Sequence, residues 1–143
     1  ACMIVTTPEK AQEFSSDKNI VVKIKGFGMA RAANGYMPDA PVPAAHRALD
    51  SAGLKLDDID ASKTHNPFAV NDAYFVKETG YDINKMNNYG CMLVWGHPQA
   101  PMGVRGVIEL IEEMVIKGGG NAMFTGCAAG DTGMAVVIEV GDK

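Results

Sequence analysis

The stretch that decides the fold is residues 103–140, GVRGVIELIEEMVIKGGGNAMFTGCAAGDTGMAVVIEV. Its first part, Gly103–Lys117, repeats apolar residues every three or four positions, which predicts an amphipathic helix packed on a core. Three glycines, Gly118–Gly120, end that helix. Two apolar runs follow, Ala122–Thr125 and Met134–Val140, and a Gly-rich turn joins them. We therefore expect a helix followed by an antiparallel hairpin.

Upstream of that stretch, strand-like and helix-like runs alternate along the chain. Strands are expected at Cys2–Val5, Ile20–Ile24, Ala61–Thr64 and Cys91–Trp95, helices at Pro8–Phe14, Pro43–Ala52 and Asn71–Thr79, and a loop at Gly26–Gly35. Asn71 is the expected N-cap of its helix. Alternation of this kind is typical of an α/β fold in which helices cover a mostly parallel sheet. The closing hairpin adds an antiparallel last strand.

Composition excludes several classes of protein. The chain has 143 residues, the size of about one domain, with 47% hydrophobic and 21% charged residues and a formal net charge of −4. The negative charge and the scattered basic residues argue against nucleic-acid binding, and no apolar run approaches the ~20 residues of a membrane span. Three cysteines without a CxxC pair argue against a disulfide framework and a zinc site. We expect no metal and a reducing, cytoplasmic location.

Three short turns carry the reactive side chains. They are Thr64–Phe68 (THNPF), Gly96–Pro98 (GHP) and Gly126–Gly130 (GCAAG), each a Gly- or Pro-marked turn beside an apolar run. Two histidines and one cysteine placed in this way can form an acid–base cluster around a reacting carbonyl. On residue type alone, a histidine in a Gly-Pro turn is as readily structural, and most free cysteines are small buried hydrophobes.

Four blocks of sequence resemble the C-terminal half of the thiolase family. Residues 88–105, NYGCMLVWGHPQAPMGVR, resemble the family's NxxGGxxxxGHPxGx(S/T)GxR signature, and residues 127–133, CAAGDTG, resemble its CxGGGxG turn. Residues 65–68, HNPF, stand at the position of the NEAF motif and are closer to the HDxF variant of sterol-carrier-type thiolases. Residues 41–60 are similar to the GPVPA…LxxxDID stretch that precedes this motif. The similarity covers roughly residues 20–143.

The resemblance implies a fold and a division of the chain. The fold would be half of a thiolase, a three-layer α/β arrangement with a five-stranded mixed sheet whose last strand is antiparallel. Residues 1–17 would be the tail of the preceding half, a strand plus a helix, and residues 18–143 would be the C-terminal domain. Because the chain opens in a strand-like run without an initiator Met, we expect it to be the tail of a longer polypeptide.

The resemblance also implies an activity. Thiolases transfer acyl groups between a 3-oxoacyl-CoA and CoA, by thiolysis or Claisen condensation, and CoA is a substrate rather than a bound cofactor. In this chain His97 would be the base for the nucleophilic thiol, and Cys127 would exchange a proton with the substrate carbon. His65 would belong to an oxyanion hole, with Asn66 as the alternative donor. The residues expected to contact substrate are Asn66, Phe68, Gly96, Pro98 and Gly130, although Phe68 is equally compatible with plain core packing.

The nucleophilic cysteine of the family has no counterpart in Ala1–Lys143. We therefore expect this chain to be inactive alone and to act, in fatty acid metabolism, with an N-terminal thiolase half or a complementary subunit, as a homo- or hetero-oligomer. Two alternatives stay open. One is a ketosynthase-like condensing enzyme, which the two histidines favour and the GHP turn and Cys127 oppose. The other is a non-catalytic scaffold subunit of a thiolase-like complex.

Overall fold

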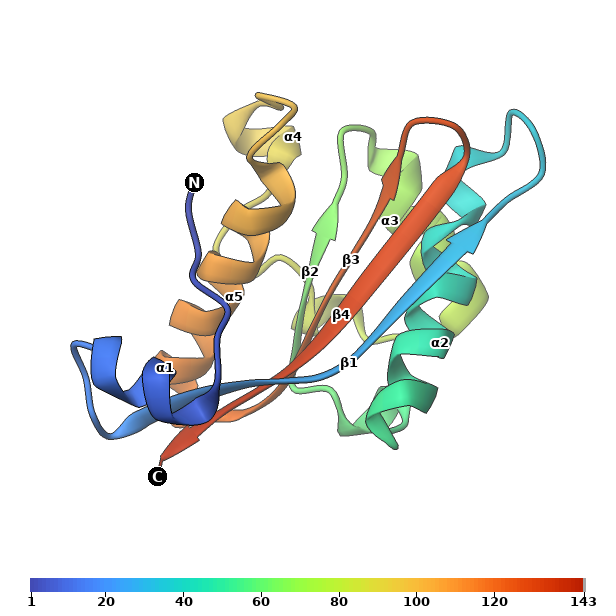
Figure 1. The fold of residues 1–143 in the computed structure, drawn as a ribbon. Coiled ribbons are helices and arrows are strands. Elements are labelled where there is room, and N and C mark those ends of the chain that lie inside the picture. The colour runs from blue at the N-terminus through green and yellow to red at the C-terminus, as the bar shows by residue number, and fades with distance from the viewer. Residues whose placement is uncertain (143) are drawn as a thin grey trace.

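The computed structural model describes residues 1–142, which form a four-stranded mixed sheet with helices around it (Figure 1). The strands are β1 (Ile20–Arg31), β2 (Ala61–His65), β3 (Gly120–Ala128) and β4 (Thr132–Asp142), in the order β1-β4-β3-β2. β4 runs antiparallel to both of its neighbours, and β2 runs parallel to β3. The predicted hairpin and antiparallel last strand are confirmed. The expectation of five strands was wrong, because the described sheet has four. The expectation of a mostly parallel sheet was also wrong, because one of the three strand pairs of the described sheet is parallel and two are antiparallel.

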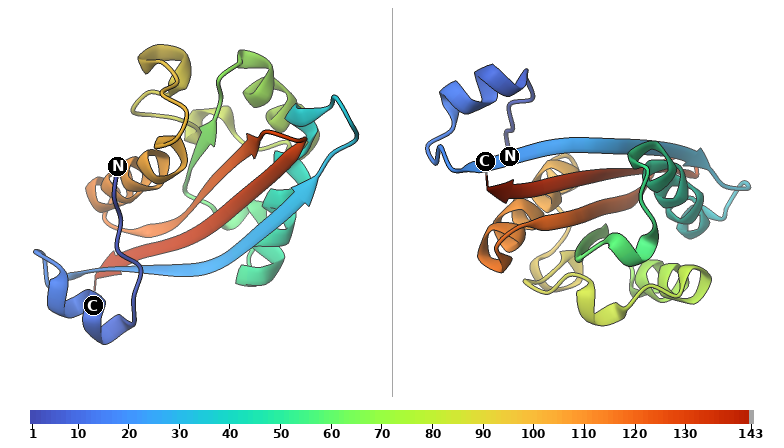
Figure 2. Two further views of the ribbon diagram at one scale, coloured as in Figure 1. Left: turned by 45° about the horizontal axis from the view of Figure 1, so that its top comes forward. Right: turned by 90° about the horizontal axis from the view of Figure 1, so that it is seen from below.

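Helices cover both faces of the sheet. They are α1 (Pro8–Phe14), α2 (Pro41–Ala52), α3 (Ala69–Thr79), α4 (Met92–Trp95) and α5 (Met102–Lys117), with short 3-10 turns at Met37–Asp39, Leu56–Asp58 and Ile83–Lys85. α2 and α3 lie on one side of the sheet and α5 on the other (Figures 1 and 2). Because side chains alternate along a strand, Met123 of β3 packs in the core under α2, whereas Phe124 packs with Leu110 of α5. The result is a three-layer α/β arrangement.

β1 packs closely against α2, and this contact explains why β1 is longer than predicted. A β-carbon on Gly26 would lie 2.6 Å from the Ala48 carbonyl oxygen, and one on Gly28 would lie 2.2 Å from the Ala44 carbonyl oxygen. The two glycines therefore let the helix backbone lie directly on the strand. The prediction of a loop was wrong for residues 26–31, because glycines that favour a loop are here required by a strand–helix contact.

Two predicted strands are not strands in the described chain. Cys2–Val5 is an exposed segment outside the sheet, because an apolar run forms a strand only where its backbone pairs with a neighbour, which the sequence of the run alone does not show. Cys91–Trp95 contains the short helix α4, in which Leu93 and Val94 are exposed. A run of five apolar residues shows no periodicity that separates a strand from a helix, so the sequence could not decide between them.

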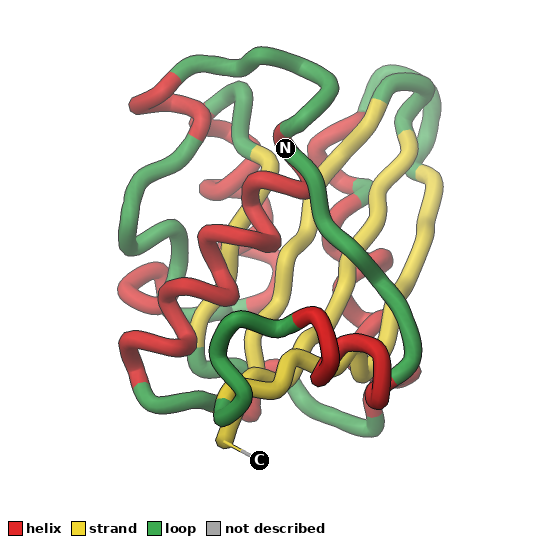
Figure 3. Tube along the Cα trace, turned by 60° about the vertical axis from the view of Figure 1, so that its left-hand side comes forward, coloured by secondary structure: helices red, strands yellow, loops and turns green. Residues whose placement is uncertain are grey.

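The N-terminal segment and α1 lie on the side of the sheet that carries α5 (Figure 3). α1 begins at Pro8 as predicted, with Thr7 as its N-cap, and none of its residues is buried. Within residues 1–142, no helix combines the length and the apolar composition that a membrane crossing requires.

Candidate active site

His65 and Cys127 meet because two parallel strands end at the same edge of the sheet. His65 is the last residue of β2 and pairs with Gly126 of β3, so Cys127 follows the paired position directly. A β-carbon on Gly126 would lie 2.4 Å from the β-carbon of His65, closer than carbon atoms pack. Glycine at this position therefore lets the two strand ends come together. Cys127 Sγ lies 3.6 Å from His65 Nδ1.

His97 reaches the same point from the turn that follows α4. Gly96 precedes it with a φ of +85°, a backbone conformation that residues with a side chain rarely adopt. His97 Nε2 lies 2.5 Å from His65 Nε2, and the two ring planes are inclined by 50°. The three motifs thus form one continuous row of contacts, from Cys127 through His65 to His97.

Burial sets the protonation states in this row. Cys127 is 6% exposed, and burial raises the pKa of its thiol, against the opposing effect of the Asn71 amide that donates to Sγ at 3.2 Å. Burial lowers the pKa of His65, and the nearby His97 lowers it further. Near neutral pH Cys127 is therefore a thiol and His65 a neutral imidazole, which can accept a proton at one ring nitrogen and donate from the other.

A pocket of about 270 Å³ opens beside the row. It is lined by Met37, His65, Pro67, Phe68, His97, Gln99, Cys127, Ala128 and Ala129. The walls are mostly apolar, and the two imidazoles and the thiol are the groups in them that can exchange protons. Such a pocket can hold an acyl group with its carbonyl against three acid–base groups. Within residues 1–142, no cluster of three or more His, Cys, Asp or Glu side chains is placed to hold a metal ion.

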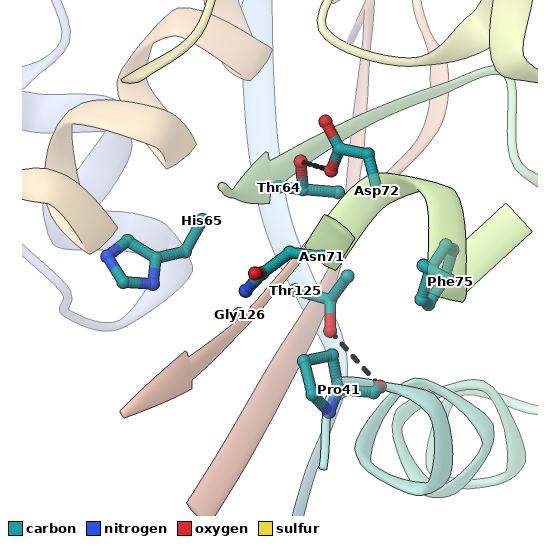
Figure 4. Close-up of a pocket in the computed structure, with 8 residues that line it drawn as sticks. All are labelled: Pro41, Thr64, His65, Asn71, Asp72, Phe75, Thr125 and Gly126. Atoms are coloured by element: carbon teal, nitrogen blue, oxygen red, sulfur yellow. Dashed lines mark hydrogen bonds between the residues drawn. The ribbon is translucent and has the colours of Figure 1, made fainter. Parts of the chain in front are cut away.

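A second, smaller cavity lies between α2, α3 and the ends of β2 and β3 (Figure 4). It is lined by Pro41, Thr64, His65, Asn71, Asp72, Phe75, Thr125 and Gly126. Its volume is about 10 Å³, which is no more than one water molecule needs. This side of His65 therefore has no room for a ligand larger than water, whereas the larger pocket does.

A buried hydrogen-bond network holds the turn that carries His65. Asp72 accepts one bond from the Thr64 hydroxyl and one from the Asn66 amide, both at 2.5 Å. The Asn87 amide donates to Asp72 at 3.3 Å and to Thr64 Oγ1 at 2.8 Å. Asn66 has no exposed surface, and its Oδ1 accepts a bond from the backbone N–H of Met92 at 3.2 Å. The network links the end of β2 to the start of α4.

The sequence matches the family model for the thiolase C-terminal domain over residues 18–140. This chain belongs to the thiolase family. It is 30% identical over 141 residues to an acetyl-CoA acetyltransferase of Syntrophomonas wolfei, covering 97% of this chain and 35% of that protein. It is 32% identical over 119 residues to the human mitochondrial 3-ketoacyl-CoA thiolase, covering 83% of this chain and 30% of that protein. The chain thus spans about a third of the length of these curated relatives.

Solved thiolase structures share the fold. The crystal structure of the human mitochondrial 3-ketoacyl-CoA thiolase in complex with CoA superposes with a TM-score of 0.80 at 32% identity, covering 82% of this chain and 30% of that one. The Bacillus anthracis acetyl-CoA acetyltransferase superposes with a TM-score of 0.84 at 29% identity, covering 92% and 33%. The expectation of a thiolase-like α/β fold is therefore confirmed, with four strands in place of five.

The thiolase residues named from sequence fall into two groups. His65, His97, Cys127 and Phe68 line the same pocket, with Phe68 61% exposed. Asn66, Gly96, Pro98 and Gly130 are not among the residues that line it. Both ends of the Asn66 amide make hydrogen bonds within the network around Asp72. Gly96 and Gly130 contribute turns of the backbone, with φ of +85° and +81°.

Several residues of the candidate site were not named from sequence. Asn71 was expected to cap α3, but the helix begins two residues earlier and the Asn71 amide donates to Cys127 instead. Met37 lies in a 3-10 turn just before α2 and reaches the pocket. Asp72 carries no motif, and a polar residue in the first turn of a helix is ordinary. No sequence signal would have separated Asp72 from a solvated surface residue.

An aromatic side chain supports the turn that carries His97. The Trp95 ring lies 4.4 Å from Arg105 Cζ, and Arg105 Nε donates to Glu109 at 2.7 Å. Lys63, which is 1% exposed, pairs with Glu109 at 2.7 Å. A β-carbon on Gly90 would lie 2.5 Å from the Trp95 ring. The Trp95 ring is therefore fixed between a cation and a close backbone, directly before Gly96 and His97.

Proposed function

We propose that this chain is the C-terminal catalytic half of a thiolase that transfers acyl groups between a 3-oxoacyl-CoA and CoA. The observation that carries the proposal is the row formed by Cys127, His65 and His97 on the wall of one pocket. Metal-independent Claisen chemistry needs a base for a thiol, an acid–base group for a carbon and donors for an oxyanion. The row offers groups suited to all three roles.

In the thiolytic direction, His97 takes the proton of the nucleophilic thiol as its sulfur bonds to the 3-oxo carbon. The bond between the α and β carbons then breaks and leaves the enolate of the shortened acyl-CoA. Cys127 gives its thiol proton to the enolate carbon, and its raised pKa keeps that proton available near neutral pH. CoA finally takes the acyl group from the nucleophile. Condensation is the reverse sequence.

His65 is the donor that we propose for the enolate oxygen. Sequence left Asn66 as an alternative, and the buried network supports His65 because both polar ends of the Asn66 amide already have partners. A neutral His65 that carries one N–H can donate to a developing oxyanion without a charge of its own. Phe68 and Met37, which both line the pocket, would contact the acyl chain or the pantetheine arm.

The partners in this proposal are acyl-CoA, CoA and a polypeptide that supplies the nucleophilic cysteine, in a homo- or hetero-oligomer. That polypeptide would be an N-terminal thiolase half, either in the same chain or as a complementary subunit. CoA would be a substrate, with no resident cofactor. We propose a reducing, cytoplasmic setting, although one relative carries the name of a mitochondrial enzyme.

The test assembles the chain with a nucleophile-bearing thiolase half and measures CoA-dependent cleavage of 3-oxoacyl-CoAs by mass spectrometry of the acyl-CoA products. Cys127→Ser should lower turnover by roughly 10²–10⁴-fold, the usual contribution of a general acid–base group. Cys2→Ser, in an exposed segment, is the matched control and should be neutral. Full activity of the Cys127→Ser assembly would instead support a non-catalytic scaffold.

A ketosynthase-like condensing enzyme remains the second candidate, because the paired imidazoles of His65 and His97 would suit it. The two candidates differ in the role of Cys127. If condensation persisted in the Cys127→Ser assembly while His65→Ala abolished it, the two-histidine mechanism would replace the thiolase mechanism.

A further inference from the structure

The spacing of the two histidines depends on residues that do not touch the pocket. Thr64 and Asn66 flank His65 in sequence, and both side chains bond to the same carboxylate, that of Asp72. Since side chains alternate along an extended backbone, residues 64 and 66 face the network while His65 faces the pocket. A single carboxylate on α3 therefore fixes the direction of the His65 side chain.

The same carboxylate is linked to His97 through Asn66 and α4. Asn66 donates from its amide nitrogen to Asp72 and accepts at its amide oxygen from the backbone N–H of Met92. Met92 begins α4, and its Sδ lies 3.3 Å from the backbone nitrogen of Asn66. α4 leads directly into the turn that holds His97. Both histidines are thus linked to Asp72. His65 is linked through its neighbours Thr64 and Asn66, and His97 is linked through Asn66 and the start of α4.

A carboxylate at position 72 suits this arrangement better than an amide would. Asp72 receives hydrogen bonds from three donors, on Thr64, Asn66 and Asn87, and a carboxylate has about four acceptor positions, whereas an amide has two. Asn66 in turn needs one donor and one acceptor at its two ends, which an amide provides and a carboxylate does not. The pair is therefore directional, with the acceptor on α3 and the donor on the turn after β2.

We propose that Asp72 is a positioning residue of the active site, which sets the distance between His65 and His97 through Thr64 and Asn66. This inference rests on the proposed thiolase function and adds to it a residue outside the pocket and outside the family motifs. Asp72 does not contact substrate. Its carboxylate holds two segments that come from separate parts of the chain in the geometry that proton transfer and oxyanion binding require.

The experiment exchanges the two groups in the assembled thiolase. Asn66→Asp alone places a second carboxylate against Asp72, so kcat should fall by at least about 10²-fold, the cost of misplacing a catalytic group by about 1 Å. Adding Asp72→Asn restores a donor–acceptor pair in reversed direction, because the new amide nitrogen on α3 can donate to the new carboxylate at position 66 while its oxygen accepts from Thr64, and Asn87 keeps its bond to Thr64 Oγ1. The kcat of the double variant should be at least about tenfold higher than that of Asn66→Asp alone.

Two further variants make the test decisive. Asp72→Ala should lower kcat by roughly 10–10²-fold with little change in KM, since the pocket wall is intact. Asp57→Asn, the same substitution on an exposed aspartate, is the control and should leave both parameters unchanged. All rates are measured well below the unfolding midpoint of each variant, so that loss of folded protein does not enter kcat.

The outcomes separate the inference from the function beneath it. An active wild-type assembly in which Asp72→Ala has normal kcat, or in which the double variant is no better than Asn66→Asp, overturns the positioning role and leaves the thiolase function standing. A wild-type assembly with no acyl-CoA cleavage or condensation overturns the proposed function itself.

Discussion

Gly126→Ala is the sharpest test of how this thiolase chain builds its site. The added β-carbon would lie 2.4 Å from the β-carbon of His65, and ordinary van der Waals contact begins at about 3.4 Å. One of the two paired strand ends must therefore move by about 1 Å. His65 is the residue next to the collision, and its contact with Cys127 at 3.6 Å depends on that strand pairing. A misplacement of about 1 Å costs about 10²-fold in rate.

The assay combines kcat/KM of the assembled thiolase with thermal unfolding. Gly126→Ala should lose about 10²-fold in kcat/KM and about 1–3 kcal/mol of stability from overpacking. Gly141→Ala is the matched control, because it makes the same change in a strand with no atom within 4 Å of the new carbon. Wild-type activity of Gly126→Ala, with Gly141→Ala also neutral, would refute the idea that close strand contact sets the site.

Three further predictions concern packing and protonation. In α5, Gly106→Ala should destabilise the domain by about 1–3 kcal/mol, since its β-carbon would lie 2.6 Å from the Phe124 ring, whereas Gly103→Ala, at 3.9 Å from that ring, should be neutral or stabilise by up to about 1 kcal/mol in urea unfolding. Burial raises the pKa of Cys127, so the pH midpoint for its alkylation by iodoacetamide should lie above the ordinary thiol value of 9.0, and a lower midpoint would contradict the buried site. Burial, with the nearby His97, lowers the pKa of His65, so the folded state binds fewer protons than the unfolded state. The contribution of neutral His65 to the free energy of unfolding is complete above about pH 6.5 and is lost as pH falls through its lower folded-state pKa. His65→Asn should therefore flatten the pH dependence of the urea unfolding midpoint across that range.

Periodic segments were predictable from sequence, and segments set by tertiary contact were not. α5 and the β3–β4 hairpin were predicted correctly, because the hydrophobic pattern of each lies within its own short stretch of sequence. β1 was predicted to stop at residue 24, because Gly26 and Gly28 favour a loop unless a helix backbone lies against them. The requirement for glycine there comes from α2, which lies far along the chain, so no local pattern could reveal it.

The candidate site divides in the same way. His65, His97 and Cys127 stand in motifs that resemble those of the thiolases, and the structure brings them together. Sequence placed Asn66 beside the substrate because of its motif position, yet it is buried with both amide ends bonded. A motif identifies which residue types occur near a site, but burial and hydrogen-bond partners depend on Asp72 and Met92, which lie outside that motif.

The reactive groups of the site are held in place by residues that do not react themselves. His97 follows Trp95, whose ring is held by Arg105 and by the close backbone of Gly90. His65 is held through its neighbours by Asp72. Because catalytic rate depends on placement within about 1 Å, we expect the position of His97 to depend on the contacts of Trp95 with Arg105 and Gly90 as well as on the GHP turn itself.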